Sequence, residues 1–186
     1  YAIQSEKVFP SASIDLKLTK TEIKQLSDQW RSKCGYKEEK GIESTTFSYD
    51  DDAKTFLEYE LGASRANELM RDKIPCWYWT TRYCKPLKQE EFSCWLDPVG
   101  HLVSFSHSIE NDTELPNVSH ADAKKMAESA LQGDVRVDLK SYKLVEDGSV
   151  EQAHRTDHYF TWEDKSQVYS GARLRCYAYI SGNEVT

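Results

Sequence analysis

The sequence has few glycine and proline residues, 8 and 5 of them among 186. Together with the 12% of aromatic residues, this argues against a disordered chain, because disordered segments are rich in glycine or proline and poor in aromatic side chains. A chain of this length can bury about two-thirds of its unfolded surface. We therefore expect one globular domain or two small ones.

An excess of positive charge is also lacking. The formal net charge is −7, and no five consecutive residues carry charge of the same sign. Such a surface repels phosphate backbones and anionic lipid headgroups on average, so we expect no nucleic-acid partner. No apolar stretch of 18 residues indicates a signal peptide or a membrane span. The chain begins at Tyr1 rather than Met, and we expect it to be a piece of a longer protein.

Cysteine pairs spaced for metal binding are missing as well. The five cysteines form no Cys-x-x-Cys motif, which excludes a zinc knuckle, a thioredoxin site and a dense disulfide scaffold. Cys84 and Cys94 flank nine residues symmetrically, and a hairpin centred near Gln89 would bring their Cβ atoms to roughly 5 Å, close enough for a disulfide. The alternative is that both are small buried thiols on strands.

Signature motifs of common enzymes are absent, including HExxH, GxSxG, the P-loop and GxGxxG. The histidines are dispersed along the chain. His101 lies beside a predicted hairpin turn, and His120 lies at the first position of a predicted helix, where solvated imidazoles are common. A Cys-His catalytic pair needs the two side chains to be close in space, and their spacing along the chain does not show whether they are.

The segment Arg155–Asp164, RTDHYFTWED, is the densest group of charged and aromatic residues. With the preceding residue it offers His154, Asp157 and His158 as candidate metal ligands. On a regular strand the two histidines share a face, about 7 Å apart, while Asp157 points away, so a three-ligand metal site would need a bulge. The alternative has Thr156, His158, Phe160 and Trp162 on one sheet face and Arg155, Asp157, Tyr159 and Glu163 in cross-strand pairs on the other. We therefore assign no catalytic, cofactor-binding or metal-ligating residue.

Residues 18–35 have the spacing of an amphipathic helix. Thr19 is predicted as its N-cap, Glu22 completes a capping box, and Gly35 ends the helix. The segment 42–49 follows with the alternation and β-branched residues of a strand.

Two further segments predict helices. Residues 52–73 begin with acidic residues and are expected to break at residues 62–64, with Ser64 capping a second short helix. Residues 118–133 are expected to form another helix, with Ser119 as N-cap. Period-two patterns predict the remaining strands in residues 76–84, 90–109 with a turn at 97–100, 139–147, 154–164 and 171–185.

Two predicted hairpins resemble each other. CWLDPVGHLV, residues 94–103, and CYAYISGNEV, residues 176–185, align with an offset of 82 at Cys, an aromatic residue, Gly and Val. The same offset aligns residues 77–79 with 159–161. We therefore predict an α+β protein of two tandem units, each a helix packed on an antiparallel meander. Their bounds are 1–16 for an N-terminal extension, 17–112 for the first unit with a helical insertion at about 52–73, and 113–186 for the second unit.

Five motifs follow one another in this chain. They are the leucine-rich segment FLEYELGASRANELMRDK; Pro75, Trp77 and Trp79; KPLKQEEF at Lys85–Phe92; Asp97, Pro98 and Gly100; and Arg155–Glu163. Together they resemble the region that precedes the membrane domain in a subset of bacterial CPBP-family intramembrane endopeptidases, the CAAX proteases and bacteriocin-processing enzymes. The resemblance covers roughly residues 40–185. Both units also resemble PepSY-like and cystatin-like modules, small α+β units.

The resemblance implies a non-catalytic, extracytoplasmic soluble domain, tethered to the membrane-embedded protease domain of the same chain. Such a domain would regulate the protease or bind its substrate or a peptide or protein partner, without a cofactor. The catalytic motif of these proteases is Glu-Glu-x-x-x-Arg. Neither Glu38-Glu39 nor Glu90-Glu91 has the required Arg, so no catalytic residue carries over. This chain is expected to cleave nothing by itself, although the full-length protein would be an endopeptidase.

Two alternatives remain from the sequence. A freestanding secreted binding or inhibitor module of PepSY or cystatin type would have a signal peptide upstream and would stop shortly after Thr186. A small metal-dependent or thiol-dependent enzyme would depend on residues such as His154 and His158.

Overall fold

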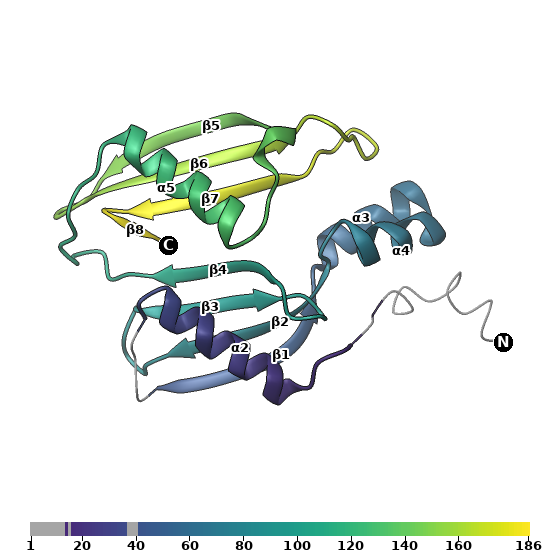
Figure 1. Ribbon diagram of the computed structural model, residues 1–186, viewed down its shortest axis with the longest axis horizontal. Helices are drawn as coiled ribbons and strands as arrows, with labels where there is room; N and C mark the ends of the chain where they lie inside the picture. Colours follow the sequence, from purple (N-terminus) through teal and green to yellow (C-terminus); the bar gives the residue numbers. More distant parts are fainter. Residues whose placement is uncertain (1–13, 15, 37–40) are drawn as a thin grey trace.

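The computed structural model describes Ile14, residues 16–36 and residues 41–186. This part of the chain is an α+β protein with four α-helices and two antiparallel four-stranded sheets (Figure 1). The α+β class is thus confirmed. The predicted N-terminal extension lies outside the described residues, except for Ile14 and Leu16.

The first sheet has the strand order β1-β2-β3-β4 and the second β5-β6-β7-β8. We call residues 14–112 the N-terminal half and residues 113–186 the C-terminal half. The N-terminal half contains α2 (Lys20–Lys33), β1 (Ile42–Tyr49), α3 (Asp51–Leu61), α4 (Ala63–Asp72), β2 (Trp77–Cys84), β3 (Glu91–Leu96) and β4 (Leu102–Ser108). The C-terminal half contains α5 (His120–Gly133), the 3-10 turn η2 (Leu139–Ser141), β5 (Tyr142–Glu151), β6 (Thr156–Asp164), β7 (Arg175–Ser181) and β8 (Glu184–Val185). Within the described ranges, no helix has both the length and the apolar character needed to cross a bilayer.

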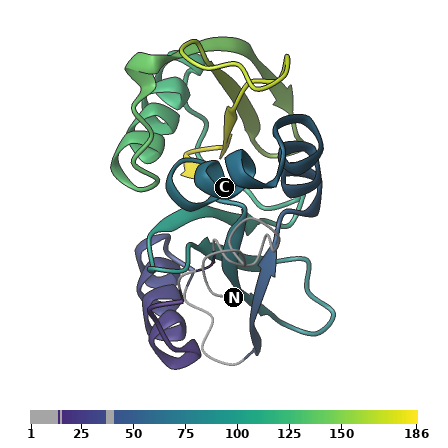
Figure 2. The same ribbon diagram turned by 90° about the vertical axis from the view of Figure 1, so that its right-hand side faces the viewer.

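Each sheet is covered on one face by one long helix. α2 inserts Ile23 into a core that includes Phe92 and Leu96, and α5 packs Ala123 and Ala127 against Phe160 and other residues of the second sheet. Both helices lie on the same side of the molecule (Figures 1 and 2). Burial of these apolar side chains is the main favourable contribution to folding of each half.

The ends of α2 and α5 follow from local sequence. The Thr19 backbone N–H donates to Glu22 Oε2 over 2.8 Å, and the Glu22 N–H donates to Thr19 Oγ1 over 3.3 Å, which is the predicted capping box. Gly35 has a φ of +81°, the left-handed conformation that glycine adopts most easily. Ser119 caps α5 as predicted, because its hydroxyl accepts from the Asp122 N–H at 3.1 Å.

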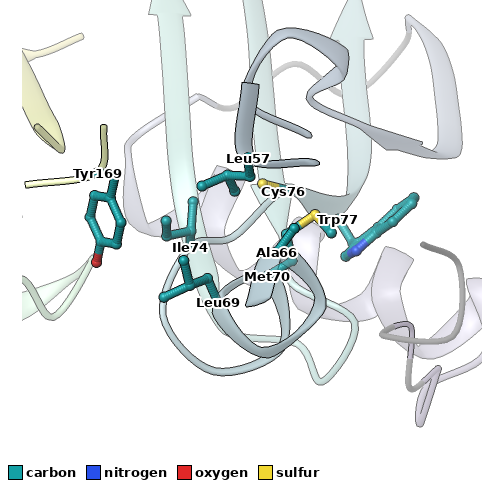
Figure 3. Packing of buried hydrophobic residues seen from close by; sticks show 8 residues of the cluster. All are labelled: Leu57, Ala66, Leu69, Met70, Ile74, Cys76, Trp77 and Tyr169. Carbon is teal, nitrogen blue, oxygen red and sulfur yellow. The ribbon is translucent and has the colours of Figure 1, made fainter. Parts of the chain in front are cut away.

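The predicted helical insertion is a pair of helices, α3 and α4, joined at Gly62. The break is at the predicted position, but the predicted cap at Ser64 is wrong: Gly62, with a φ of +77°, precedes the first residue of α4 and no side chain caps that helix. The pair packs on the start of β2 and on Tyr169, which belongs to the loop between β6 and β7 (Figure 3). The Ser170 hydroxyl also donates to Glu60. The helix pair α3 and α4 therefore contacts the C-terminal half as well as its own half.

The predicted proximity of Cys84 and Cys94 is wrong. Cys84 pairs with Glu91 across the β2–β3 hairpin, whereas Cys94 pairs with Thr81. The hairpin is therefore centred between Leu87 and Lys88 rather than near Gln89, and all five cysteines are free thiols. Cys94 is buried in the core under α2, as the alternative predicted.

The offset of 82 residues does not align the strand pairing of the two hairpins. Leu96 pairs with Leu102 in the first hairpin, and this offset takes them to Ala178 and Glu184, whereas Glu184 pairs with Ser181. Cys94 and Cys176 both pack against the cores under the helices. Trp79 also packs against the core under α2, whereas Thr161, its counterpart at this offset, points to the other face of its sheet, since its neighbours on β6 belong to the core. A shift of one residue is needed there.

The predicted strand 154–164 begins at Thr156. His158, Phe160 and Trp162 are buried, and the two aromatic residues belong to the core under α5. The alternative reading of the RTDHYFTWED segment, an ordinary strand with these residues on one face, is confirmed for these positions.

Arg155, just before β6, joins the two halves. Its side chain is buried, its Nε donates to Asp157 Oδ1 over 2.9 Å, and its Nη1 donates to the carbonyl oxygens of Glu110 and Thr113 over 2.9 and 3.0 Å. Glu110 and Thr113 belong to the segment that connects β4 to α5. The guanidinium therefore holds that connection against the second sheet.

Two further contacts fix the same connection. The side-chain oxygen of Asn117 accepts from the Thr156 N–H at 2.6 Å. A Cβ at Gly182, in the β7–β8 turn, would lie 2.5 Å from Leu115 Cβ. Because Gly182 also has a φ of +57°, a side chain there would be strained and would push the connection away.

We predict that Arg155→Met destabilises the protein by about 3 kcal/mol, because Asp157 loses its cation and the carbonyl groups of Glu110 and Thr113 each lose a charged donor. Chemical denaturation checks this value. The matched control is Arg175→Met on the same sheet: Arg175 donates to Glu163 Oε2 over 2.8 Å but is half exposed, so its loss should destabilise the protein much less. Equal losses in both variants would contradict the role of Arg155.

Candidate functional site

A pocket of about 480 Å³ lies where the two halves meet. It is lined by the end of α2, the β2–β3 turn, the end of β4 with the connection that follows, and Glu184 of β8. A volume of this size accommodates a small ligand or a short peptide segment. Its walls come from both halves, so its shape depends on the contacts that hold the halves together.

His107 of β4 is the buried polar group of this pocket, with 8% of its side chain exposed. Its Nε2 lies 3.1 Å from Glu90 Oε1, and its ring meets that of Tyr36 edge-on with 5.4 Å between centroids. Its Nδ1 has no hydrogen-bond partner in the described part of the chain and lies 3.9 Å from Glu184 Oε2. A buried polar atom without a partner is costly, so this nitrogen would gain from a ligand group.

Charged side chains of both signs surround His107. Lys85 and Lys88 line the pocket together with Glu90, Glu110 and Glu184, and Lys88 Nζ lies 3.5 Å from Glu110 Oε1. These side chains can match both a cationic and an anionic group of one ligand. Peptides offer such groups, together with backbone donors and acceptors.

A second polar cluster lies at the start of α5. His120 Nδ1 is 3.3 Å from His158 Nδ1, and Ser149 Oγ lies 2.7 Å from His158 Nδ1 and 3.3 Å from His120 Nδ1. The outer nitrogens have separate partners: His120 Nε2 lies 2.7 Å from Asp147 Oδ2, and His158 Nε2 lies 3.2 Å from the Val118 carbonyl oxygen. The start of α5, strand β5 and strand β6 therefore meet here.

Packing fixes both imidazole rings. His158 is buried, while 40% of the His120 side chain is exposed. The His120 ring lies 4.9 Å from that of Phe160, centroid to centroid. His120 is thus not the freely solvated residue that its position at the start of a helix predicted. Asp147 and Ser149 lie on β5, which pairs with β6, and both contact the His120 ring.

The three candidate ligands of the RTDHYFTWED segment do not meet. His154 is exposed in the turn before β6, Asp157 pairs with Arg155, and only His158 joins a polar cluster. Among residues 14, 16–36 and 41–186, no three or more His, Cys, Asp or Glu side chains form a group suited to a metal ion. His101 is exposed, as predicted, and contacts Asp97 at 3.0 Å.

Sequence reasoning missed the partnership of His120 and His158. The two were already expected at a helix start and on one face of a strand. Their distance depends on which turn of α5 crosses which part of β6, and no periodicity in the sequence contains that information. The unpartnered nitrogen of His107 was missed for the same reason, since two of its neighbours, Tyr36 and Glu184, lie far from it in the chain.

Burial weakens the cysteines as nucleophiles. Loss of solvation raises the pKa of Cys34, Cys94 and Cys176 to about 11 and that of Cys76 to about 12. The thiolate is the reactive form, so these four thiols are poorly suited to nucleophilic catalysis at neutral pH.

Comparison with known proteins gives no relative: no family model, no curated protein and no solved structure matches this chain.

We predict slow alkylation of Cys94 and Cys76 in the folded protein at pH 8. A pKa raised from 9.0 to about 11 lowers the thiolate fraction about a hundredfold at that pH, and burial slows access further. Timed reaction with iodoacetamide, followed by peptide mass mapping, measures the rates. In guanidinium chloride both residues should react at the ordinary rate of a free thiol. Fast alkylation of Cys94 in the folded protein would contradict the burial described above.

Proposed function

We propose that this chain is a non-catalytic domain of a membrane-embedded CAAX-type protease, and that it binds a peptide segment of a substrate or partner in the pocket around His107. The observation that carries the binding role is the buried His107 Nδ1, which has no hydrogen-bond partner among the described residues and lies in a pocket with charges of both signs. The link to the protease rests on the motifs that resemble the CPBP family. An extracytoplasmic position, tethered to the protease domain, is part of the proposal.

We also propose that the two halves are tandem copies of one PepSY-like unit. Residues 21–30 of α2 and 121–130 of α5 have the same order of buried, half-buried and exposed positions. Their N-caps, Thr19 and Ser119, are also 100 residues apart. Each helix is followed by a four-stranded antiparallel sheet whose strands lie in sequence order. The pair α3 and α4 is then an insertion after the first strand of the first copy.

Two of the segments that resemble the CPBP family make hydrogen bonds that support a structural role. Arg155, the first residue of the RTDHYFTWED segment, holds the connection between the halves. Asp97, in the DPVG turn, accepts from the backbone N–H groups of Val99 and His101 over 2.9 and 2.8 Å. Residues that stabilise turns and connections are consistent with a binding domain whose ligand contacts lie elsewhere, in the pocket.

A freestanding secreted PepSY-like or cystatin-like module would use the same pocket. The gene distinguishes the two proposals: a protease-linked domain continues into several apolar spans that carry Glu-Glu-x-x-x-Arg, and a freestanding module has a signal peptide and stops soon after Thr186.

We predict that the purified chain cleaves neither casein nor short peptides, with or without added zinc. Its role in this proposal is to bind, and the family's catalytic motif is not found in its sequence. Incubation followed by mass spectrometry checks for cleavage products. Metal-dependent proteolysis that copurifies with the chain through several columns would refute the proposal.

In the full-length protease, we predict that Glu184→Gln and Lys88→Ala each raise KM by about twofold to fivefold and leave kcat unchanged. Loss of a partly exposed ionic contact weakens ligand binding by this amount without touching the reaction centre. Steady-state kinetics with a peptide substrate measures both constants. Glu146→Gln, on the exposed part of β5 away from the pocket, is the matched control. If the pocket variants and the control behave alike, the pocket is not the binding site.

A further inference from the structure

In the cluster at the start of α5, the two histidine rings have fewer hydrogen-bond donors around them than nitrogens that need to accept a hydrogen bond. A carbonyl oxygen only accepts hydrogen bonds, so His158 Nε2 must donate to Val118 O, and its Nδ1 then carries a lone pair when the ring is neutral. A carboxylate also only accepts, so His120 Nε2 must donate to Asp147, and its Nδ1 likewise carries a lone pair. The two Nδ1 atoms that carry these lone pairs lie 3.3 Å apart.

Ser149 can satisfy only one of these nitrogens. Its hydroxyl has one hydrogen, and the closer nitrogen is His158 Nδ1, at 2.7 Å compared with 3.3 Å for His120 Nδ1. Within the described part of the chain, His120 Nδ1 therefore receives no hydrogen while both rings are neutral. The arrangement is completed either by an extra proton on His120 or by a cation that both lone pairs coordinate.

We propose that His120 and His158 bind one zinc ion through their Nδ1 atoms. Two nitrogens about 2.05 Å from a tetrahedral zinc ion lie about 3.4 Å apart, close to the 3.3 Å between these atoms. Ser149 Oγ is next to both nitrogens, and water or a side chain of a partner completes the coordination.

The outer contacts of both rings are those of zinc-binding histidines. Such histidines donate their second nitrogen to a carboxylate or a backbone carbonyl, which fixes the tautomer and turns the other lone pair toward the metal. Asp147 does this for His120 and Val118 O does it for His158. His158 is held rigidly in the core, while His120 is partly exposed and leaves a path for the ion.

The proposed site draws fewer ligands from the protein than a structural zinc site does. It has only two protein ligands of the usual types, so it does not form a group of three or more His, Cys, Asp or Glu. Two-histidine coordination leaves positions open, and we expect weaker binding than in closed four-ligand zinc sites. This inference does not depend on the proposed role in a protease.

Zinc titration of the purified chain at neutral pH, by calorimetry and by competition with a chromophoric chelator, tests the proposal. We expect one zinc ion per chain and a rise in Tm with added zinc. His120→Gln should abolish this binding. Asp147→Asn keeps both ligands but loses the orienting carboxylate and should weaken zinc binding by about 10-fold to 100-fold. Cobalt in place of zinc should give the intense visible absorption of tetrahedral coordination.

His101→Gln is the matched control, because it also removes a histidine that contacts an aspartate, His101 with Asp97, and should leave zinc binding unchanged. His120 is the residue chosen for substitution since it is partly exposed, whereas replacing the buried His158 endangers folding. Circular dichroism verifies that each variant is folded. The proposal is overturned if the folded wild type binds no zinc, if His120→Gln binds it equally well, or if proton-detected NMR shows a proton on His120 Nδ1 in the presence of excess zinc.

Discussion

The buried guanidinium of Arg155 determines how the parts of this molecule are held together. A buried charge is stable only when its donors are satisfied, and Arg155 obtains its acceptors from Asp157 beside it and from two carbonyl groups of the connection between the halves. The connection is thereby fixed against the second sheet where β6 begins. Asn117, which accepts a hydrogen bond from the Thr156 N–H, lies three residues before His120, the first residue of α5, so the start of that helix is fixed as well.

Both polar sites depend on this fixed connection. Toward the N-terminal half, residues 109–115 form a wall of the pocket that contains His107. Toward the C-terminal half, the connection ends at Val118 and His120, which provide a carbonyl oxygen and an imidazole to the histidine cluster. One segment without regular secondary structure therefore positions groups in two sites with different chemistry. Irregular segments positioned by a rigid scaffold commonly carry function in this way.

The two sites also differ in their balance of polar groups. His107 is surrounded by charged side chains that can rearrange around a ligand, since Glu90, Glu110 and Lys88 are substantially exposed. The His120 ring, at the start of α5, packs on the ring of Phe160. The Nδ1 atoms of His120 and His158 are 3.3 Å apart, a spacing that suits one ion. The first arrangement suits an extended ligand of mixed charge, and the second suits a compact cation.

Sequence alone determined the elements, because helix caps and periodicity act over a few residues. The capping box at Thr19, the break at Gly62 and the buried face of β6 are all local properties, and all were predicted. Tertiary structure alone decided the rest. The β2–β3 register separated Cys84 from Cys94, the crossing of α5 over β6 brought His120 to His158, and the buried side chain of Arg155 found acceptors some 40 residues away. Each of these depends on packing between segments distant in the chain, and local sequence patterns carry no distance between such segments.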